Sequence, residues 1–176
     1  MKKNLIAAIV TVSTLFATSA MAADGEVHFK GEIIDSACEV VNNVSNPLDV
    51  TLGQVAKTAF TGSGSTAAAT KFTLQLKNCP DSVTKAAVKF DGTAEGGDNN
   101  VLQLTQESGV ATGVGIQLSD ASNAVLPLFT ASTSYTLVAG STVNNLDFVA
   151  RYIATTDDDI TAGPANSVAS FSVIYN

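Results

Sequence analysis

Few residues in this 176-residue chain carry side chains suited to catalysis or metal binding. His28 is the one histidine, and Cys38 and Cys79 are the two cysteines. A catalytic or metal-binding role for them needs convergent partners, and these three side chains do not complete a tetrahedral metal shell. The sequence therefore predicts no histidine- or cysteine-based active site, no metal site and no cofactor. An enzyme built on a pair of carboxylates stays an alternative, because spacing alone does not exclude one.

Three other features resemble parts of ligand sites but lack the required pattern. The acidic run 157–159 does not have the alternating ligand spacing of a calcium loop, and we expect a solvated turn there. The Gly-Ser repeat 62–65 is not followed by the lysine of a phosphate-binding loop, so we expect a flexible loop. Arg151, the single arginine, lies on a predicted strand, where it either anchors a loop or pairs with a carboxylate.

The first residues have the composition of an export signal. Lys2 and Lys3 precede an apolar run that ends near Phe16, and residues 20–22 form an A-x-A cleavage pattern. The apolar run is shorter than the roughly 20 residues that span a bilayer. We therefore expect a signal peptide over 1–22 and an exported mature chain.

The expected export affects how the two cysteines are interpreted. An isolated pair in an exported protein favours one disulfide, Cys38–Cys79, over the alternatives of free thiols or a metal site. Closing a loop of about 40 residues contributes roughly 4 kcal/mol in the chain-entropy description of disulfides.

The charge of the mature chain excludes two classes of partner. The full chain has 9 basic and 16 acidic residues, so removal of Lys2 and Lys3 leaves 9 − 2 = 7 basic residues and a net charge of 7 − 16 = −9. Nucleic-acid phosphates and anionic lipids both require clustered Lys and Arg. We therefore expect no nucleic-acid partner and no docking on an anionic membrane surface.

The hydrophobic pattern is that of an all-β protein in one domain. Short runs with period-two alternation are separated by Gly, Asn, Asp or Ser, which is typical of an antiparallel sandwich or barrel. The predicted strands cover residues 27–34, 49–52, 71–77, 86–90, 101–105, 114–118, 135–138, 146–153 and 167–175.

Both ends of the mature chain are strongly patterned. Near the start, Val27, Phe29, Gly31 and Ile33 fall on one face of a strand, and charged residues and His28 occupy the other face. Apolar residues this close to a terminus would be costly to leave in water, at roughly 2 kcal/mol for each large side chain. Two interpretations remain: the first strand of a complete sandwich, or a strand that another molecule receives.

The last strand continues almost to the end of the chain. Ala169, Phe171, Val173 and Tyr175 share one face of it and alternate with Ser170, Ser172 and Ile174. A domain that ends on its most regular strand either buries that strand centrally or leaves it available to a partner.

Taken in order, these motifs resemble the fimbrial (pilin) subunits of the chaperone–usher pathway, and most closely the major subunit of type 1 fimbriae. The resemblance covers essentially the whole mature chain. Gly163, fourteenth from the end, and Tyr175, next to last, match the C-terminal pattern of the family. The other matching motifs are Val27-His28-Phe29-Lys30-Gly31-Glu32, Ala37-Cys38, Leu52-Gly53-Gln54-Val55, Asn78-Cys79, Gly113-Val114-Gly115-Ile116-Gln117 and Ala150-Arg151-Tyr152.

The resemblance implies an incomplete immunoglobulin-like sandwich that lacks its final strand and is completed by donor-strand exchange. Residues 23–35 would be the donor-strand extension and 36–176 the pilin domain. The donor residues would be Val27, Phe29, Gly31 and Ile33, with Gly31 as a notch without a side chain. The acceptor groove would be formed by Gly163, Ala169, Phe171, Val173 and Tyr175.

The same resemblance implies the partners and the location of the protein. A periplasmic chaperone would fill the groove first, and a second fimbrial subunit would replace it at the outer-membrane usher, so that the fibre grows on the cell surface. The chain would be a structural subunit that supports cell adhesion, not an enzyme. The alternatives are a minor subunit at the tip or base of the fibre, or a self-contained secreted β-sandwich that binds a ligand.

Overall fold

The computed structural model describes residues 24–34 and 36–175, and the chain divides into two units, residues 1–33 and 34–176. The predicted signal peptide lies outside the described residues. In the first unit, residues 24–33 carry no strand, so the strand predicted over 27–34 is wrong for the isolated subunit. The physical reason is that a strand needs a ladder partner for its backbone groups. No helix in the described part of the chain is long and apolar enough to cross a membrane.

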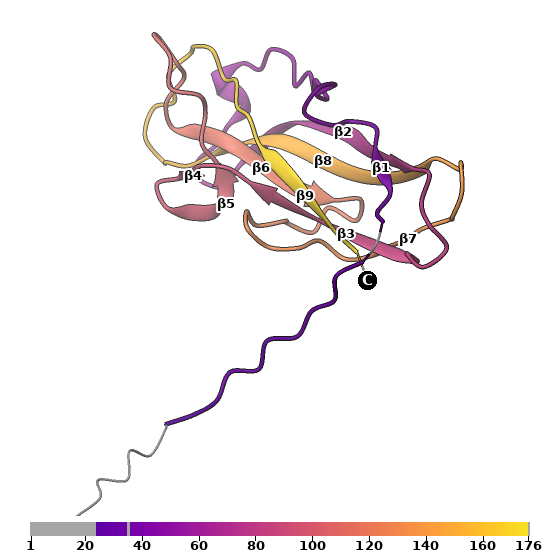
Figure 1. The fold of residues 1–176 in the computed structure, drawn as a ribbon. Helices are drawn as coiled ribbons and strands as arrows, with labels where there is room; N and C mark the ends of the chain where they lie inside the picture. Colours follow the sequence, from indigo (N-terminus) through magenta and orange to yellow (C-terminus); the bar gives the residue numbers. More distant parts are fainter. Residues whose placement is uncertain (1–23, 35, 176) are drawn as a thin grey trace, which may run out of the picture. The chain divides into compact units, whose positions relative to one another are not determined.

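The second unit contains two antiparallel sheets (Figure 1). The six-stranded sheet has the order β1-β2-β8-β6-β5-β4, and the three-stranded sheet has the order β7-β3-β9. A 3-10 turn, η1, spans Lys57–Ala59. The strands are β1 Glu39–Val40, β2 Thr66–Lys77, β3 Lys85–Asp91, β4 Ala94–Glu95, β5 Asp98–Leu102, β6 Val114–Asp120, β7 Tyr135–Thr136, β8 Asn144–Ala154 and β9 Ser170–Tyr175.

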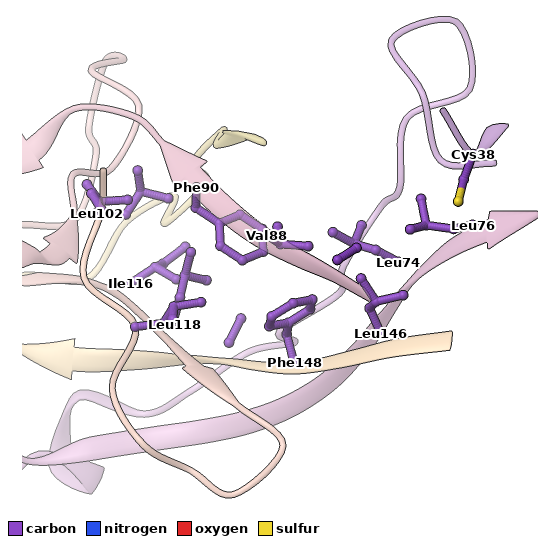
Figure 2. Packing of buried hydrophobic residues seen from close by; sticks show 14 of the residues in the cluster. Cys38, Leu74, Leu76, Val88, Phe90, Leu102, Ile116, Leu118, Leu146 and Phe148 are labelled. Atoms are coloured by element: carbon purple, nitrogen blue, oxygen red, sulfur yellow. The ribbon is translucent and has the colours of Figure 1, made fainter. Parts of the chain in front are cut away.

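The inner faces of both sheets form one hydrophobic core. Alternating residues of β2, β8, β6 and β3 point into it, including Leu74, Leu146, Leu118 and Val88 (Figure 2). A cluster of aromatic rings joins the two sheets: the ring centroids of Phe90 and Phe148 are 5.1 Å apart, and those of Phe72 and Phe148 are 5.6 Å apart. The Phe90–Phe148 pair connects β3 to β8 across the two sheets and is edge-to-face, a geometry that stabilises a core beyond the area that it buries.

The all-β sandwich is confirmed, and most predicted strands are present with shifted ends. The strand predicted over 49–52 is wrong, because these residues pair with no neighbouring strand. Val50 and Leu52 nevertheless pack against the core, and this partial burial explains the apolar alternation in the sequence. Two short strands, β1 and β4, were not predicted, since two residues give no periodic pattern.

Candidate functional site: the open edge of strand β9

Strand β9 forms one edge of the three-stranded sheet, and its two faces are in different environments. Phe171, Val173 and Tyr175 are half-buried against the core, whereas Ser170, Ser172 and Ile174 are exposed. Each inner residue of β9 lies opposite an inner residue of β3, for example Val173 opposite Val88. The inward face predicted for the last strand is therefore present, but it is only partly covered.

The hydrogen bonds of β3 determine which way the backbone of β9 points. Val88 donates its N–H to the hydroxyl of Ser132 and accepts a hydrogen bond from the Ser132 N–H, so both of its backbone groups face away from β9. In an antiparallel ladder, paired residues alternate between exchanging both bonds and exchanging none. Since the Val88–Val173 pair exchanges none, Ser170, Ser172 and Ile174 bond to β3. Phe171, Val173 and Tyr175 direct their N–H and C=O groups to the open edge.

Apolar residues from β1 and the segment that follows it approach the same core. Val40, Val50 and Leu52 are half-buried against it, as are the inner residues of β9. The end of β9 lies close to the start of β1, because the Tyr175 hydroxyl donates a hydrogen bond to the carbonyl oxygen of Cys38 at 3.4 Å. Burial raises the pKa of Tyr175, and this hydrogen bond partly opposes the shift.

The predicted disulfide Cys38–Cys79 is confirmed, with a Cα–Cα distance of 4.1 Å. It joins the residue before β1 to the end of β2. Asn144, which is buried, places an amide 3.6 Å from the Cys79 sulfur and also bonds to both backbone groups of Val138. The disulfide, the loop after β7 and the end of β9 thus form one end of the domain, which we call the disulfide end.

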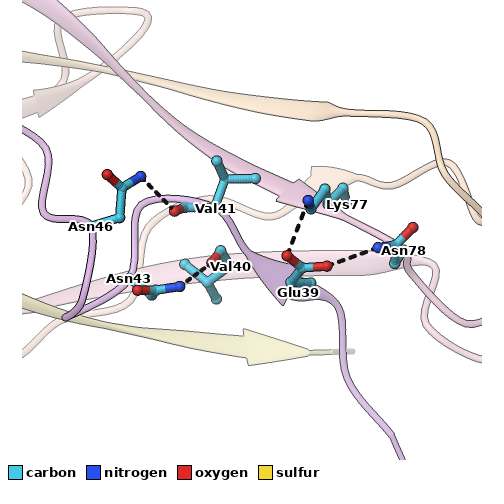
Figure 3. Close-up of polar contacts among 7 residues, drawn as sticks. All are labelled: Glu39, Val40, Val41, Asn43, Asn46, Lys77 and Asn78. Carbon is cyan, nitrogen blue, oxygen red and sulfur yellow. Dashed lines mark hydrogen bonds and ion pairs between the residues drawn. The ribbon is translucent and has the colours of Figure 1, made fainter.

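Polar contacts hold β1 against β2 at the disulfide end (Figure 3). Glu39 forms an ion pair with Lys77 at 3.0 Å and accepts a hydrogen bond from Asn78 at 2.8 Å. The Lys77 and Asn78 contacts lower the pKa of the exposed Glu39 carboxyl. Since β1 has only two ladder pairs with β2, these side-chain contacts strengthen the attachment of β1 to β2.

The opposite end of β9 borders a small cavity. Thr93, Gln103, Leu104, Ser167 and Val168 contribute to its lining, and its volume is about 210 Å³. Ala169, which precedes β9, is half-buried against the core. The polar lining gives no periodic sequence pattern, so this cavity was not found from the sequence. Of its two large apolar residues, Leu104 is buried and Val168 is 79% exposed.

Gly163, the first of the predicted groove residues, lies elsewhere in the domain. A Cβ atom at this position would overlap the carbonyl oxygen of Gly109 and would lie 2.7 Å from the nitrogen of Ala111. The backbone of residues 109–111 therefore explains why this residue is a glycine. Its assignment to the acceptor groove stays a prediction.

In the first unit, the predicted donor side chains are exposed. The exposed fractions are 77% for Val27, 92% for Phe29 and 98% for Ile33. Nothing lies within 4 Å of where a Cβ atom on Gly31 would be. Any requirement for glycine at position 31 therefore does not come from the isolated subunit.

His28, the acidic turn and Arg151, which were considered for chemistry in the sequence, each contact other side chains or backbone groups. His28 lies 3.5 Å from Glu26. Asp157 accepts a hydrogen bond from the N–H of Ser63 at 2.8 Å, which ties the acidic turn to the Gly-Ser loop. Arg151 donates hydrogen bonds to Ser119 and Asn123, so of its two predicted roles the loop anchor is confirmed. Among residues 24–34 and 36–175, no group of three or more His, Cys, Asp or Glu side chains is placed to hold a metal ion.

Comparison with known proteins identifies the family. The family model described as fimbrial protein matches residues 27–176. The chain is 38% identical to long polar fimbria protein A of Salmonella typhimurium, with 99% of this chain and 97% of that protein covered. It is 39% identical to the type-1 fimbrial protein A chain of Escherichia coli K12, with 98% of both chains covered.

Solved structures agree with the fold. A type I fimbria protein from Burkholderia pseudomallei has a TM-score of 0.54 and 34% identity, covering 80% of this chain and 86% of that one. The P pilus rod subunit has a TM-score of 0.64 and 19% identity, covering 80% of this chain and all of that one, and so supports the fold alone. The edge strand β9, the disulfide and these relatives together lead to one conclusion: the chain belongs to the fimbrial protein family, whose members are non-enzymatic structural subunits of fibres on the bacterial surface.

Proposed function

We propose that this subunit polymerises head to tail by adding residues 24–33 to the open edge of β9 in another copy. The observation that supports the proposal is the direction of the β9 backbone. Phe171, Val173 and Tyr175 present both their N–H and C=O groups at an edge whose inner side chains are half-covered. Strand addition would satisfy these backbone groups and complete the core at the same time.

The pattern of the extension fits this edge. A strand that bonds to Phe171, Val173 and Tyr175 places its own bonded residues on the same inner face. Val27, Phe29 and Ile33 would then be buried, at roughly 2 kcal/mol each. Gly31, which has no side chain, would leave room for a large inner residue of β9 such as Phe171.

The direction of the added strand follows from the position of Cys38. The bond between Tyr175 and Cys38 places the end of β9 beside the residue from which the extension of the same subunit departs. A parallel donor would bring its own domain to that end and would compete for space with the next subunit in the fibre. An antiparallel donor brings its domain to the start of β9, at the opposite end. Each subunit then contacts its two neighbours at opposite ends of its domain, so the assembly is an open filament.

Assembly of this kind needs protection of the edge before a second subunit arrives. We therefore propose that a periplasmic chaperone covers the β9 edge first and that the exchange takes place at an outer-membrane usher. Most copies would form the shaft of the fibre. Counting subunits in isolated fibres separates this role from that of a minor tip or base subunit.

The proposal is tested with a peptide and an acceptor that cannot donate its own strand. The acceptor is the mature chain with Phe29→Asp, and the peptide spans residues 24–36. We expect the peptide to bind, to raise the melting temperature of the acceptor and to compete with fibre growth of the unmodified chain. A peptide with Gly31→Leu is the matched control and is expected to bind much more weakly. Failure of the natural peptide to bind would favour a self-contained sandwich.

A further inference from the structure

Exposed apolar residues lie at opposite ends of β9 and are not among the inner-face residues that strand exchange would cover. The first surface belongs to the disulfide end, in the loop 137–143. Its Val138 and Val143 are 55% and 47% exposed. Asn144 bonds to Val138, and Gly140 donates its N–H to the carbonyl oxygen of Cys79 at 2.8 Å. The loop is thus held firmly beside the disulfide with two valines in solvent.

The second surface lies at the start of β9. Val168, at 79% exposure, stands beside the cavity lined by Thr93, Gln103 and Ser167. The hydroxyl of Ser167 donates a hydrogen bond to the carbonyl oxygen of Gln103, and the N–H of Thr105 donates one to Asn166 at 2.7 Å. This segment is therefore fixed in place as well. We call it the β9-start rim.

The chain between the extension and the disulfide is short enough to bring these surfaces together. In antiparallel addition, with Val27 opposite the end of β9 and Ile33 opposite its start, Ile33 of one subunit lies near residues 167–169 of the next. From Ile33 to Cys38 there are five residue steps, which span at most about 18 Å when fully extended. The disulfide end of the donor subunit must therefore lie close to the β9-start rim of the acceptor.

The charges of the two surfaces allow this approach. The chain carries a net charge of −7, but residues 121–146 and 160–175 contain no charged side chain. The residues lining the cavity are also uncharged. Copies of an acidic protein repel each other least where such neutral segments meet.

We propose that Val138 and Val143 at the disulfide end of one subunit dock against Val168 on the β9-start rim of the next. This contact rests on the proposed strand exchange and adds a second, side-chain interface between consecutive subunits of the same chain. It adds a contact that would fix the angle between neighbouring domains. It also slows dissociation, because leaving the groove then requires both interfaces to open.

Cross-linking tests whether the two surfaces meet. Fibres are assembled from the full mature chain carrying Val138→Cys and Val168→Cys, and a short thiol-specific linker is added. We expect a covalent ladder of subunits. Val125→Cys with Val168→Cys is the matched control, because Val125 is similarly exposed at 44% but lies on the hairpin after β6. No ladder from the first pair, or an equal ladder from both, would overturn the proposal.

Dissociation kinetics provide a measurement without new thiols. Val138→Ser and Val168→Ser are expected to make fibres dissociate in denaturant roughly tenfold faster, as for loss of one buried valine contact. Val125→Ser should dissociate like the unmodified chain. If all three variants dissociate alike while the 24–36 peptide still binds, the docking contact is wrong and strand exchange stands. If the peptide does not bind, both proposals fail.

Discussion

At the scale of single residues, Gly163 and Gly31 have opposite surroundings within one subunit. Gly163 is packed against the backbone of residues 109–111 within one subunit. Gly31 has open space around it in the isolated chain, so no contact within one subunit requires its small size. The sequence motif placed both residues in the exchange machinery, but the motif alone does not separate a fold requirement from an assembly requirement.

Gly163→Ala is expected to destabilise the subunit by about 1–3 kcal/mol, as for other overpacked sites, because backbone atoms cannot move aside as a flexible side chain can. The free energy of unfolding in urea measures this. Gly25→Ala is the matched control, since a Cβ atom there meets nothing within 4 Å. An unchanged unfolding midpoint for Gly163→Ala would show that the backbone of residues 109–111 moves to accommodate the methyl group without loss of stability.

At the scale of elements, β9 was largely predictable and its neighbours less so. Period-two alternation correctly placed Phe171, Val173 and Tyr175 inside and the intervening residues outside. The direction of the backbone hydrogen bonds was not predictable, since it depends on the contact of Ser132 with β3, 44 positions from Val88 in sequence. The same limit explains the wrong strand over 49–52: alternation reports which side chains are buried and not whether the backbone has a partner.

The hydrogen-bond direction predicts alternating protection of the β9 amides from exchange with solvent. In the Phe29→Asp acceptor, the amides of Ser172 and Ile174 should exchange slowly because they bond to β3, whereas those of Phe171 and Val173 should exchange quickly. Hydrogen exchange followed by NMR measures each amide separately. Addition of the 24–36 peptide should then slow the exchange of the Phe171 and Val173 amides. Equal protection of all four amides before addition would contradict the open edge.

At the scale of the whole molecule, the disulfide connects the start of the domain to the segment that follows β2. Cys38 precedes β1, which has two ladder pairs with β2. The pairing could be predicted from two cysteines in an exported chain, but the position of the bridge beside Tyr175 could not, because it depends on where β9 ends.

Replacing both cysteines, Cys38→Ser with Cys79→Ser, is expected to lower the free energy of unfolding by about 4 kcal/mol, the chain-entropy value for a loop of this length. Urea unfolding of the acceptor variant measures the difference. Adding a reductant to the disulfide-containing protein should reproduce the loss, and adding it to the double variant should change nothing. Equal stability with and without the bridge would mean that the reduced unfolded chain is already compact.

The same bridge determines how a pulling force would pass through the fibre. Tension on residues 24–33 reaches the domain at Cys38 and crosses the disulfide to Cys79, beyond the end of β2. The two ladder pairs of β1, which would unzip one after the other, are thereby bypassed. The force acts instead along β2, whose nine register pairs with β8 must shear together. In a fibre under tension, the load on each subunit would thus pass through the longest pair of strands in the domain, β2 and β8.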